Sequence, residues 1–395
     1  MTRIEQPRRP TPRRRLQLIT TIALLALALA LGLGIWRHDI NRYHQEQLVV
    51  ANNNEFEPVR NFAAAASGAG ISTTTPEIVK IGLEIDNIHD LSLPNQTFQA
   101  TGYYWLSWPE QVQEWLDKEN INSDQLVTFM NIINTDDLMI TPVRSTPKKL
   151  DNGWRTERYL FSADFSSERI DFTNFPFQTI SFPIRIEVNP DEFALNSSMP
   201  IALIADPRQP NLLGSTLDIP GLVLKGGKLA PYIHNYFGSD PNKPEITYSQ
   251  VLSLTVFTTH PLASVGEWLI PILIVMLTVF IAPNISGKLS ELRIAIPSAA
   301  LLTLVVMQQG FEQTIPQLNY LTFLDLTYLW CYAVTIGLFI LFVWSANQWA
   351  SIDSNHPQAE ARMTAMNARI DRMDRRFQII SVFATMVFML MALLR

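Results

Sequence analysis

Six side chains between Ala295 and Gln313 form the most informative pattern in this sequence. They step along the chain by four, three, four, three and four residues: Ala295, Ala299, Leu302, Val306, Gln309 and Gln313. This spacing puts all six on one stripe of an α-helix. The stripe is small at one end, apolar in the middle and amide-bearing at the other end. Amides held in hydrocarbon are unfavourable unless they meet water or a hydrogen-bonding partner.

The residues alone leave two interpretations of this stripe open. It can pack against other helices, with the glutamines as interhelical hydrogen-bonding groups. Alternatively it faces water. Glu291 precedes Ala295 by four residues and would extend the stripe, whereas Arg293 falls off it.

The stripe lies in one of five segments that are long enough to cross a membrane. They run approximately over Leu16–Trp36, Trp268–Ile285, Ile294–Gly310, Leu326–Trp344 and Phe377–Leu394. The 395 residues are 47% apolar and 17% charged, which is high and low for a soluble protein. The one cysteine, Cys331, excludes an intrachain disulfide framework and a zinc site built on cysteines.

Several function classes lack their signatures in this sequence. No G-x-S-x-G, P-loop, H-E-x-x-H or dinucleotide fingerprint occurs, so we expect no enzyme activity and no cofactor. The six histidines are scattered, so we expect no metal site. The only dense basic cluster is at the N-terminus, which argues against nucleic-acid binding. Transporters normally carry ionisable residues inside their spans, and here none falls between the ends of a span.

The charges of the loops alternate as the positive-inside rule requires. The rule predicts a multi-pass protein of the cell (inner) membrane, with a cytoplasmic N-terminus and with the large domain outside, extracellular or periplasmic. We expect a basic cytoplasmic N-terminus (1–15), a membrane anchor or cleaved signal peptide (16–36), a linker (37–75), an outer β-domain (76–265) and a membrane domain (266–395) with a cytoplasmic loop (346–376).

The outer domain carries the periodicity of β-strands. In "EIVKIGLEID", Val79, Ile81, Leu83 and Ile85 alternate with polar residues, which is typical of a half-buried strand. Further strands are predicted at Thr97–Trp108, Trp154–Phe165, Thr179–Val188, Leu222–Leu229 and Thr247–Thr258. Only Pro109–Ser123 has a helical pattern. The spacing of these strands predicts an antiparallel β-sandwich, so the fold class is a multidomain membrane protein with an outer β-sandwich followed by a four-helix transmembrane bundle.

Four stretches, in this order, resemble the pentameric ligand-gated ion channels, the Cys-loop receptor superfamily of neurotransmitter-gated channels. "NQTFQATGYYWLSW" resembles the family's second strand, and "FTNFPFQTISFPIRIE" its signature loop at the foot of the outer domain. "EWLIPILIV" resembles the first membrane helix, and "LLTLVVMQQGFEQTIPQLNYLTFLDLTY" the pore helix and the start of the third helix. The resemblance covers roughly Pro76 to Arg395. The loop cysteines are absent, as in bacterial members, and Gln178 stands where the family usually has Asp.

The resemblance implies five identical subunits in a lipid membrane around an ion pore. The lining, from the cytoplasm outward, would be Glu291, Ala295, Ala299, Leu302, Val306, Gln309 and Gln313. Leu302 and Val306 would form an apolar ring that gates by losing its water. Five Glu291 carboxylates would favour cations, whereas Arg293 would disfavour them if it pointed inward.

The resemblance also implies an agonist site and a coupling region. Aromatic residues at the family's agonist positions are Trp105, Phe129, Phe193, Tyr236 and Phe237, although an aromatic in a sandwich is usually core. Such a cage could hold an ammonium group by cation–π attraction. No acidic residue is clearly paired with it, so a proton, a divalent cation and an organic amine stay open as ligands. The candidate coupling residues are Leu93, Pro94, Phe175, Pro176, Phe177, Pro316 and Leu318.

A second function remains open beside the channel. A membrane-anchored sensor could capture a solute in its β-sandwich and have no pore. Such a sensor would not need a stripe that changes from small to apolar to amide. The helical stripe Met363, Met366, Ile370, Met373 and Phe377 is compatible with a helix extending below the membrane or one lying on its surface.

Overall fold

The structure is a computed structural model that describes residues 56–58, 75–167, 170–207, 213–214, 217–238, 244–287, 289–351 and 359–394. The predicted basic N-terminus and the anchor at 16–36 lie outside these residues, as does most of the linker. Contacts divide the chain into two units. The β unit holds the described residues up to Asp171 and Thr179–Thr259, and the helical unit holds Phe172–Gln178 and His260–Arg395.

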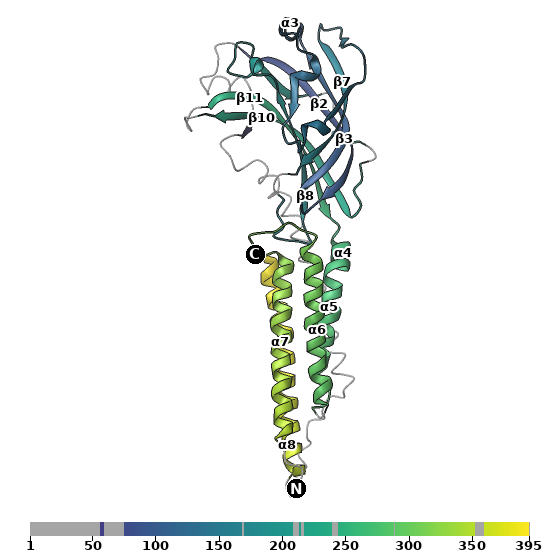
Figure 1. The fold of residues 1–395 in the computed structure, drawn as a ribbon, viewed down its shortest axis with the longest axis vertical. Helices are drawn as coiled ribbons and strands as arrows, with labels where there is room; N and C mark the ends of the chain where they lie inside the picture. Colours follow the sequence, from purple (N-terminus) through teal and green to yellow (C-terminus); the bar gives the residue numbers. More distant parts are fainter. Residues whose placement is uncertain are drawn as a thin grey trace, which may run out of the picture. The chain divides into compact units, whose positions relative to one another are not determined.

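The β unit contains two sheets (Figure 1). The five-stranded sheet has the order β1 (Phe56–Pro58), β10 (Leu222–Phe237), β11 (Pro244–Thr259), β8 (Thr179–Val188) and β4 (Val127–Phe129). The six-stranded sheet contains β5 (Met139–Pro142), β7 (Arg155–Ser166), β3 (Thr97–Trp108), β2 (Glu77–Ser92) and β9 (Ile201–Ala205), with β6 (Lys148–Lys149) paired to β7. The paired strands are antiparallel except β2 and β9, which run parallel.

Aromatic rings from the two sheets pack against each other and form the core of the β unit. Phe98 of β3 meets Phe182 of β8 at a centroid distance of 5.0 Å. Phe129 of β4 meets Tyr104 of β3 at 5.6 Å and Phe161 of β7 at 5.2 Å. Because these pairs join one sheet to the other, the two sheets lie face to face.

Most of the predicted strands agree with the structure. β3 and β8 have the predicted bounds, and the apolar residues of "EIVKIGLEID" are buried as their alternation indicates. The predicted helix is found as α3, Glu110–Glu119. β10 is longer than predicted and continues through Pro231, which lies just before the stretch that pairs with β1.

The helical unit begins with α4 (Pro261–Ser264), a π turn at Val265–Leu269 and α5 (Ile270–Ile281), which ends in a 3₁₀ turn at Ala282–Asn284. It continues with α6 (Ser290–Glu312), α7 (Phe323–Ala350) and α8 (Ala359–Leu394). Within the described residues, three helical segments are long and apolar enough to cross a membrane: Pro261–Asn284, Ser290–Glu312 and Phe323–Ala350. α8 is one continuous helix that includes both the predicted last span and the end of the predicted cytoplasmic loop.

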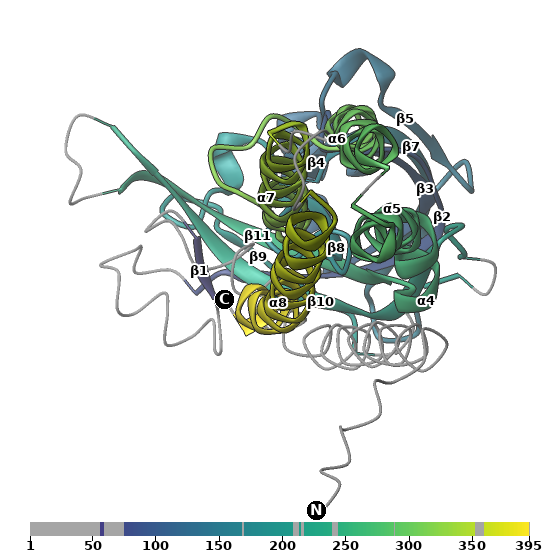
Figure 2. The same cartoon turned by 90° about the horizontal axis from the view of Figure 1, so that it is seen from below.

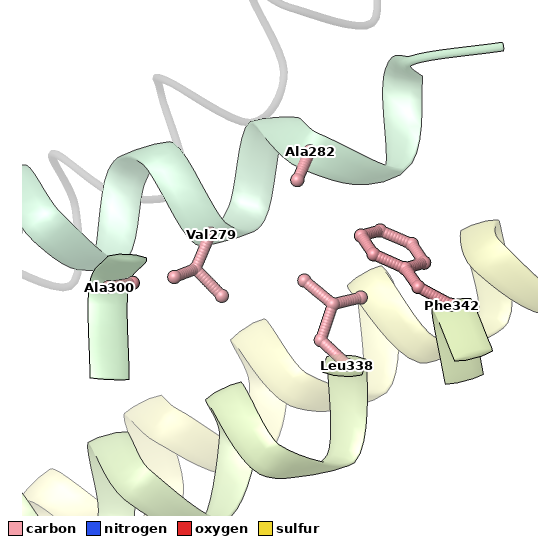
Figure 3. Close-up of a cluster of buried hydrophobic side chains, with 5 residues drawn as sticks. All are labelled: Val279, Ala282, Ala300, Leu338 and Phe342. Carbon is pink, nitrogen blue, oxygen red and sulfur yellow. The ribbon is translucent and has the colours of Figure 1, made fainter. Parts of the chain in front are cut away.

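Helices α5 to α8 lie side by side when viewed along their length (Figure 2). A buried apolar cluster joins three of them: Val279 of α5 and Ala282 after it, Ala300 of α6, and Leu338 and Phe342 of α7 (Figure 3). α8 joins the bundle through Trp330, whose ring stacks on Phe388 with centroids 4.8 Å apart. The bundle therefore covers one face of α6, the face that carries Ala300.

Candidate functional site

The seven residues of the predicted stripe all lie on the exposed side of α6 and of the residue that follows it. They are Glu291, Ala295, Ala299, Leu302, Val306, Gln309 and Gln313. The buried residues of α6 are Arg293, Pro297, Ala300, Leu304 and Phe311, which face the chain's own bundle. The chain therefore leaves the stripe uncovered and uses the other face of α6 for its own packing.

Two neighbouring glutamines near the end of α6 have different surroundings. Gln308 accepts a hydrogen bond from the hydroxyl of Tyr332 on α7 at 2.7 Å, and its amide nitrogen donates to Glu312 at 2.8 Å. Gln309 is exposed. The helical spacing places Gln309 on the stripe. The structure shows that Gln308 is hydrogen-bonded to the chain's own bundle.

Leu302 and Val306 are the large apolar side chains of the stripe, and they are 67% and 59% exposed. They lie one helical turn apart, with small alanines before them and amides after them. Exposed apolar side chains of this size indicate contact with lipid or with another protein surface. The exposed Gln309 and Gln313 on the same stripe are poor contacts for lipid tails.

The two charged side chains at the start of α6 have different surroundings. Glu291 is exposed, whereas Arg293 is only 1% exposed and its guanidinium lies 2.5 Å from the carboxylate of Asp374 on α8. Two residues along an α-helix correspond to a rotation of about 200°, which puts the two side chains on nearly opposite faces. The stripe thus carries an acid at this end and no base.

The predicted coupling residues Phe175, Pro176 and Phe177 lie in the segment Phe172–Gln178, which belongs to the helical unit and is here called the FPF loop. The ring of Phe175 lies 5.2 Å from that of Phe311 in the last turn of α6 and 5.4 Å from that of Trp268 in the π turn. Phe177 lies 6.2 Å from Phe323 at the start of α7. The carbonyl of Thr173 accepts the backbone N–H of Phe323 at 2.8 Å. The loop is therefore in direct contact with the ends of the helices on either side of the turn that joins α6 to α7.

The other predicted coupling residues are placed as follows. Pro176 is buried in the FPF loop, and Pro316 and Leu318 are half-buried in the connection between α6 and α7. Leu93 is half-buried and Pro94 is exposed at the turn between β2 and β3, in the β unit. Their part in coupling stays a prediction.

The five aromatic residues predicted to meet a ligand separate into two groups. Phe129 is buried in the core between the sheets, and Phe193 is fully buried with its ring stacked on Trp115 at 6.4 Å. The structure thus gives these two the core position that is usual for an aromatic residue of a packed β-domain. Trp105 and Phe237 are half-buried, and Tyr236 is 37% exposed. These three side chains are accessible at the surface of the chain, where a ligand could contact them.

Two of the surface aromatics are hydrogen-bonded to carboxylates that the sequence did not pair with them. The indole N–H of Trp105 donates to Asp206 at 3.3 Å. The hydroxyl of Tyr236 donates to Glu187 at 3.1 Å. Glu187 lies on β8 and Tyr236 on β10, so the pair reaches across the intervening strand β11. Sequence spacing gives no signal for a contact between alternate strands.

Glu187 is the centre of a small polar cluster on the five-stranded sheet. Its carboxylate also accepts from the amide nitrogen of Gln250 at 3.0 Å and lies 2.5 Å from Nδ1 of His234. The ring of His234 is 4.1 Å from that of Tyr236. This cluster gives the surface beside Tyr236 a buried, well-bonded carboxylate.

Tyr248 extends the same aromatic group, because its ring lies 5.6 Å from that of Tyr236. Burial raises the pKa of Tyr248 above its ordinary value, and the carboxylate of Asp191, which accepts its hydroxyl proton, adds to this shift. The hydroxyl therefore stays protonated as a donor. In the part of the chain that the structure describes, no three His, Cys, Asp or Glu side chains are grouped so as to hold a metal ion.

No protein-family model matches this chain, and a search of curated proteins finds no match either.

Proposed function

We propose that this chain is one subunit of a homopentameric ligand-gated ion channel in the cell membrane. In this proposal α6 lines the pore, α5, α7 and α8 surround it, and the two packed sheets form an outer β-sandwich. The N-terminus is cytoplasmic and the β unit is extracellular or periplasmic. The resemblance of the four sequence motifs to the ligand-gated channels suggests this assembly, and the exposed stripe of α6 supports it.

The observation that carries the proposal is that α6 packs one face against the chain's own bundle and leaves the whole stripe exposed. Glu291, Gln309 and Gln313 would be unfavourable against lipid tails. Five copies around a central axis turn the stripe toward water and bury the flanks of each α6 against its neighbours. Leu302 and Val306 then form a ring in which a narrow column of water is unstable, and the closed pore is dry there.

The charges at the start of α6 favour a cation-selective pore. Five exposed Glu291 side chains make a ring of carboxylates at the cytoplasmic mouth, which attracts cations and repels anions. Arg293 does not oppose this ring because its guanidinium is buried beside Asp374.

The surface aromatics favour an organic cation as the ligand. Trp105 lies on β3 of one sheet and Tyr236 on β10 of the other, and each is bonded to a carboxylate. In the proposed pentamer they come from neighbouring subunits and face each other across the interface. An ammonium group suits rings and carboxylates together, by cation–π attraction and by charge.

The second candidate is a membrane-anchored sensor that binds a solute with the same aromatics and has no pore. The ligand cluster is compatible with it. The stripe does not favour it, because a protein that only transmits a signal has no use for an uncovered acid, an apolar band and two amides in line on one helix.

Electrical recording tests the proposal directly. We expect the purified protein in planar bilayers to give discrete single-channel currents under some condition of amine, pH or divalent cation. A broad screen without current, together with a particle that is not pentameric, would contradict the channel. Binding of an amine without current would favour the sensor.

A further inference from the structure

Arg293 is the largest charged side chain that is buried among the described residues of the helical unit. It lies in the first turn of α6 and is 1% exposed. Its guanidinium contacts two other helices of the same chain. One terminal nitrogen lies 2.5 Å from Oδ2 of Asp374 on α8, and the other lies 3.4 Å from the hydroxyl of Ser345 on α7. The guanidinium carbon is 4.1 Å from the ring centroid of Phe342, a cation–π geometry.

Asp374 supplies the negative charge that this position requires. The N-terminal end of an α-helix is positive, so a cation in the first turn is unfavourable there. Burial adds to the penalty unless an anion is in contact. Asp374 is 4% exposed, and among the described residues it is the acid that forms an ion pair with Arg293. The arginine therefore depends on a residue that is 81 positions away in the sequence.

The pair is closely packed but incompletely hydrogen-bonded. Three buried polar atoms around it have no partner among the described residues: Nε of Arg293, Oδ1 of Asp374 and Nε1 of Trp349. Gly287 closes the site. A Cβ at position 287 would lie 2.9 Å from Nε1 of Trp349 and 3.4 Å from a terminal nitrogen of Arg293. Since few other bonds hold the guanidinium, the contact with Asp374 is the main one that keeps it inside the bundle.

A released Arg293 has a short route to water. Long basic side chains keep their stems in apolar surroundings and extend their charged ends to the nearest aqueous surface. Arg293 is at the end of α6, where Glu291 and Leu292 are exposed. Without its anion, the guanidinium would leave the bundle and approach the carboxylate of Glu291.

We propose that Asp374 determines charge selectivity by holding Arg293 away from the pore. This inference rests on the proposed channel function and adds a positioning residue on α8 to it. The carboxylate of Asp374 does not itself face the pore. It fixes the Arg293 charge between α7 and α8, so that Glu291 alone sets the potential at the mouth.

Measurement of permeability ratios tests this positioning role. Currents would be recorded in asymmetric KCl for the wild-type pentamer and for Asp374→Asn, which keeps the shape of the side chain and removes its charge. We expect the ratio of K⁺ to Cl⁻ permeability to fall several-fold, because the freed guanidinium of each subunit offsets a Glu291 carboxylate. Asp374→Glu restores the anion and is expected to keep the wild-type ratio.

Two further variants separate charge position from structural damage. Asp371→Asn removes the same charge one turn earlier on the exposed side of α8 and is expected to leave the ratio unchanged. Arg293→Gln combined with Asp374→Asn leaves no cation to release and is expected to restore cation selectivity. If Asp374→Asn does not assemble alone, co-expression with excess wild-type chain gives mixed pentamers that should show a smaller fall in the ratio.

The outcomes distinguish this inference from the function on which it rests. A wild-type protein that conducts with cation selectivity, together with an Asp374→Asn protein of unchanged ratio, overturns the inference and leaves the channel intact. Equal falls in Asp371→Asn and Asp374→Asn also overturn it, because they indicate loss of local negative charge and not release of Arg293. A wild-type protein without any current overturns both.

Discussion

At the scale of single residues, neighbouring side chains of α6 differ in their exposure. Leu302 is exposed, whereas Leu301 beside it is half-buried. A serine introduced at Leu302 would put a hydroxyl into the proposed dry ring of all five subunits. A serine at Leu301 would change packing and leave the ring apolar.

Leu302→Ser is expected to open the channel without agonist or to lower the agonist concentration that it needs. A shift of about 0.5 kcal/mol in each subunit sums to about 2.5 kcal/mol, which is about 60-fold in the closed–open equilibrium. Open probability in single-channel records measures this shift. Leu301→Ser is the matched control and should shift the equilibrium far less. Equal effects of the two serines would mean that this face of α6 is packed and does not line a pore.

A second prediction at this scale concerns Gly82 on β2. A Cβ at this position would lie 1.8 Å from Cζ2 of Trp105, closer than any non-bonded contact. Gly82→Ala must therefore displace the indole from Asp206. We expect it to lower the free energy of unfolding by about 1–3 kcal/mol, the usual effect of overpacking. Thermal denaturation measures this loss, and in a Trp105→Ala background the same substitution should have little effect.

The sequence could predict which residues of α6 share a face, but not which face the bundle covers. The spacing separated Gln309 from Gln308 because the helical period is fixed. The hydrogen bond from Tyr332 to Gln308 depends on how α7 packs on α6, which no local pattern encodes. The pairs Trp105–Asp206 and Tyr236–Glu187 were missed for the same reason, since each joins distant parts of the chain.

At the scale of elements, the FPF loop is short but has contacts with three parts of the helical unit. Phe175 packs on Phe311 and Trp268, and Phe177 packs on Phe323. β8 begins at Thr179, directly after the loop, so the chain connects this strand without a linker to the loop that contacts the ends of α6 and α7. This continuity suits a loop that transmits binding to a pore.

Phe175→Ala is expected to weaken this transmission more than Phe177→Ala. Phe175 contacts the proposed pore helix, whereas Phe177 contacts α7. Both rings are buried, so the two substitutions should cost similar stability. The measurement is the agonist concentration for half-maximal current beside the agonist affinity from binding. Phe175→Ala should raise the first and leave the second nearly unchanged, and equal behaviour of the two variants would contradict a special role for Phe175.

Helices and strands with a clear hydrophobic period were predicted correctly. Strands that depend on pairing with a distant strand were missed. β2 was predicted from its plain alternation, and β3 from its many aromatic and β-branched residues. β9 was missed because it is a five-residue strand that pairs in parallel with β2, far away in sequence. The sequence left open whether the stripe from Met363 to Phe377 belongs to a helix that extends below the membrane or to one that lies on its surface, and the structure makes it part of the same helix as the predicted last span. α8 runs unbroken from Ala359, since the arginines of its first half lie on an exposed side and do not end a helix.

At the scale of the whole molecule, the proposal requires an assembly that one chain does not display. We expect native mass spectrometry in detergent to give about five times the chain mass of 44.8 kDa. Electron cryo-microscopy should show a five-fold axis, as a closed ring of identical subunits requires. A dimer or a monomer that still binds an amine would exclude the pore and favour the sensor.

The π turn at Val265–Leu269 has a consequence for how the ends of these helices could move. Pro271 follows it, and in a regular helix its ring would clash with the carbonyl of Glu267, so the extra residue of the π turn relieves that conflict. Passing this extra residue along the helix would rotate each residue that it crosses by about 100° and shift it by about 1.5 Å. Trp268 lies in the turn, with its ring 5.4 Å from Phe175 and 6.0 Å from Phe311. A single step of this kind would therefore rotate Trp268 away from both rings and separate the start of this helix from the FPF loop.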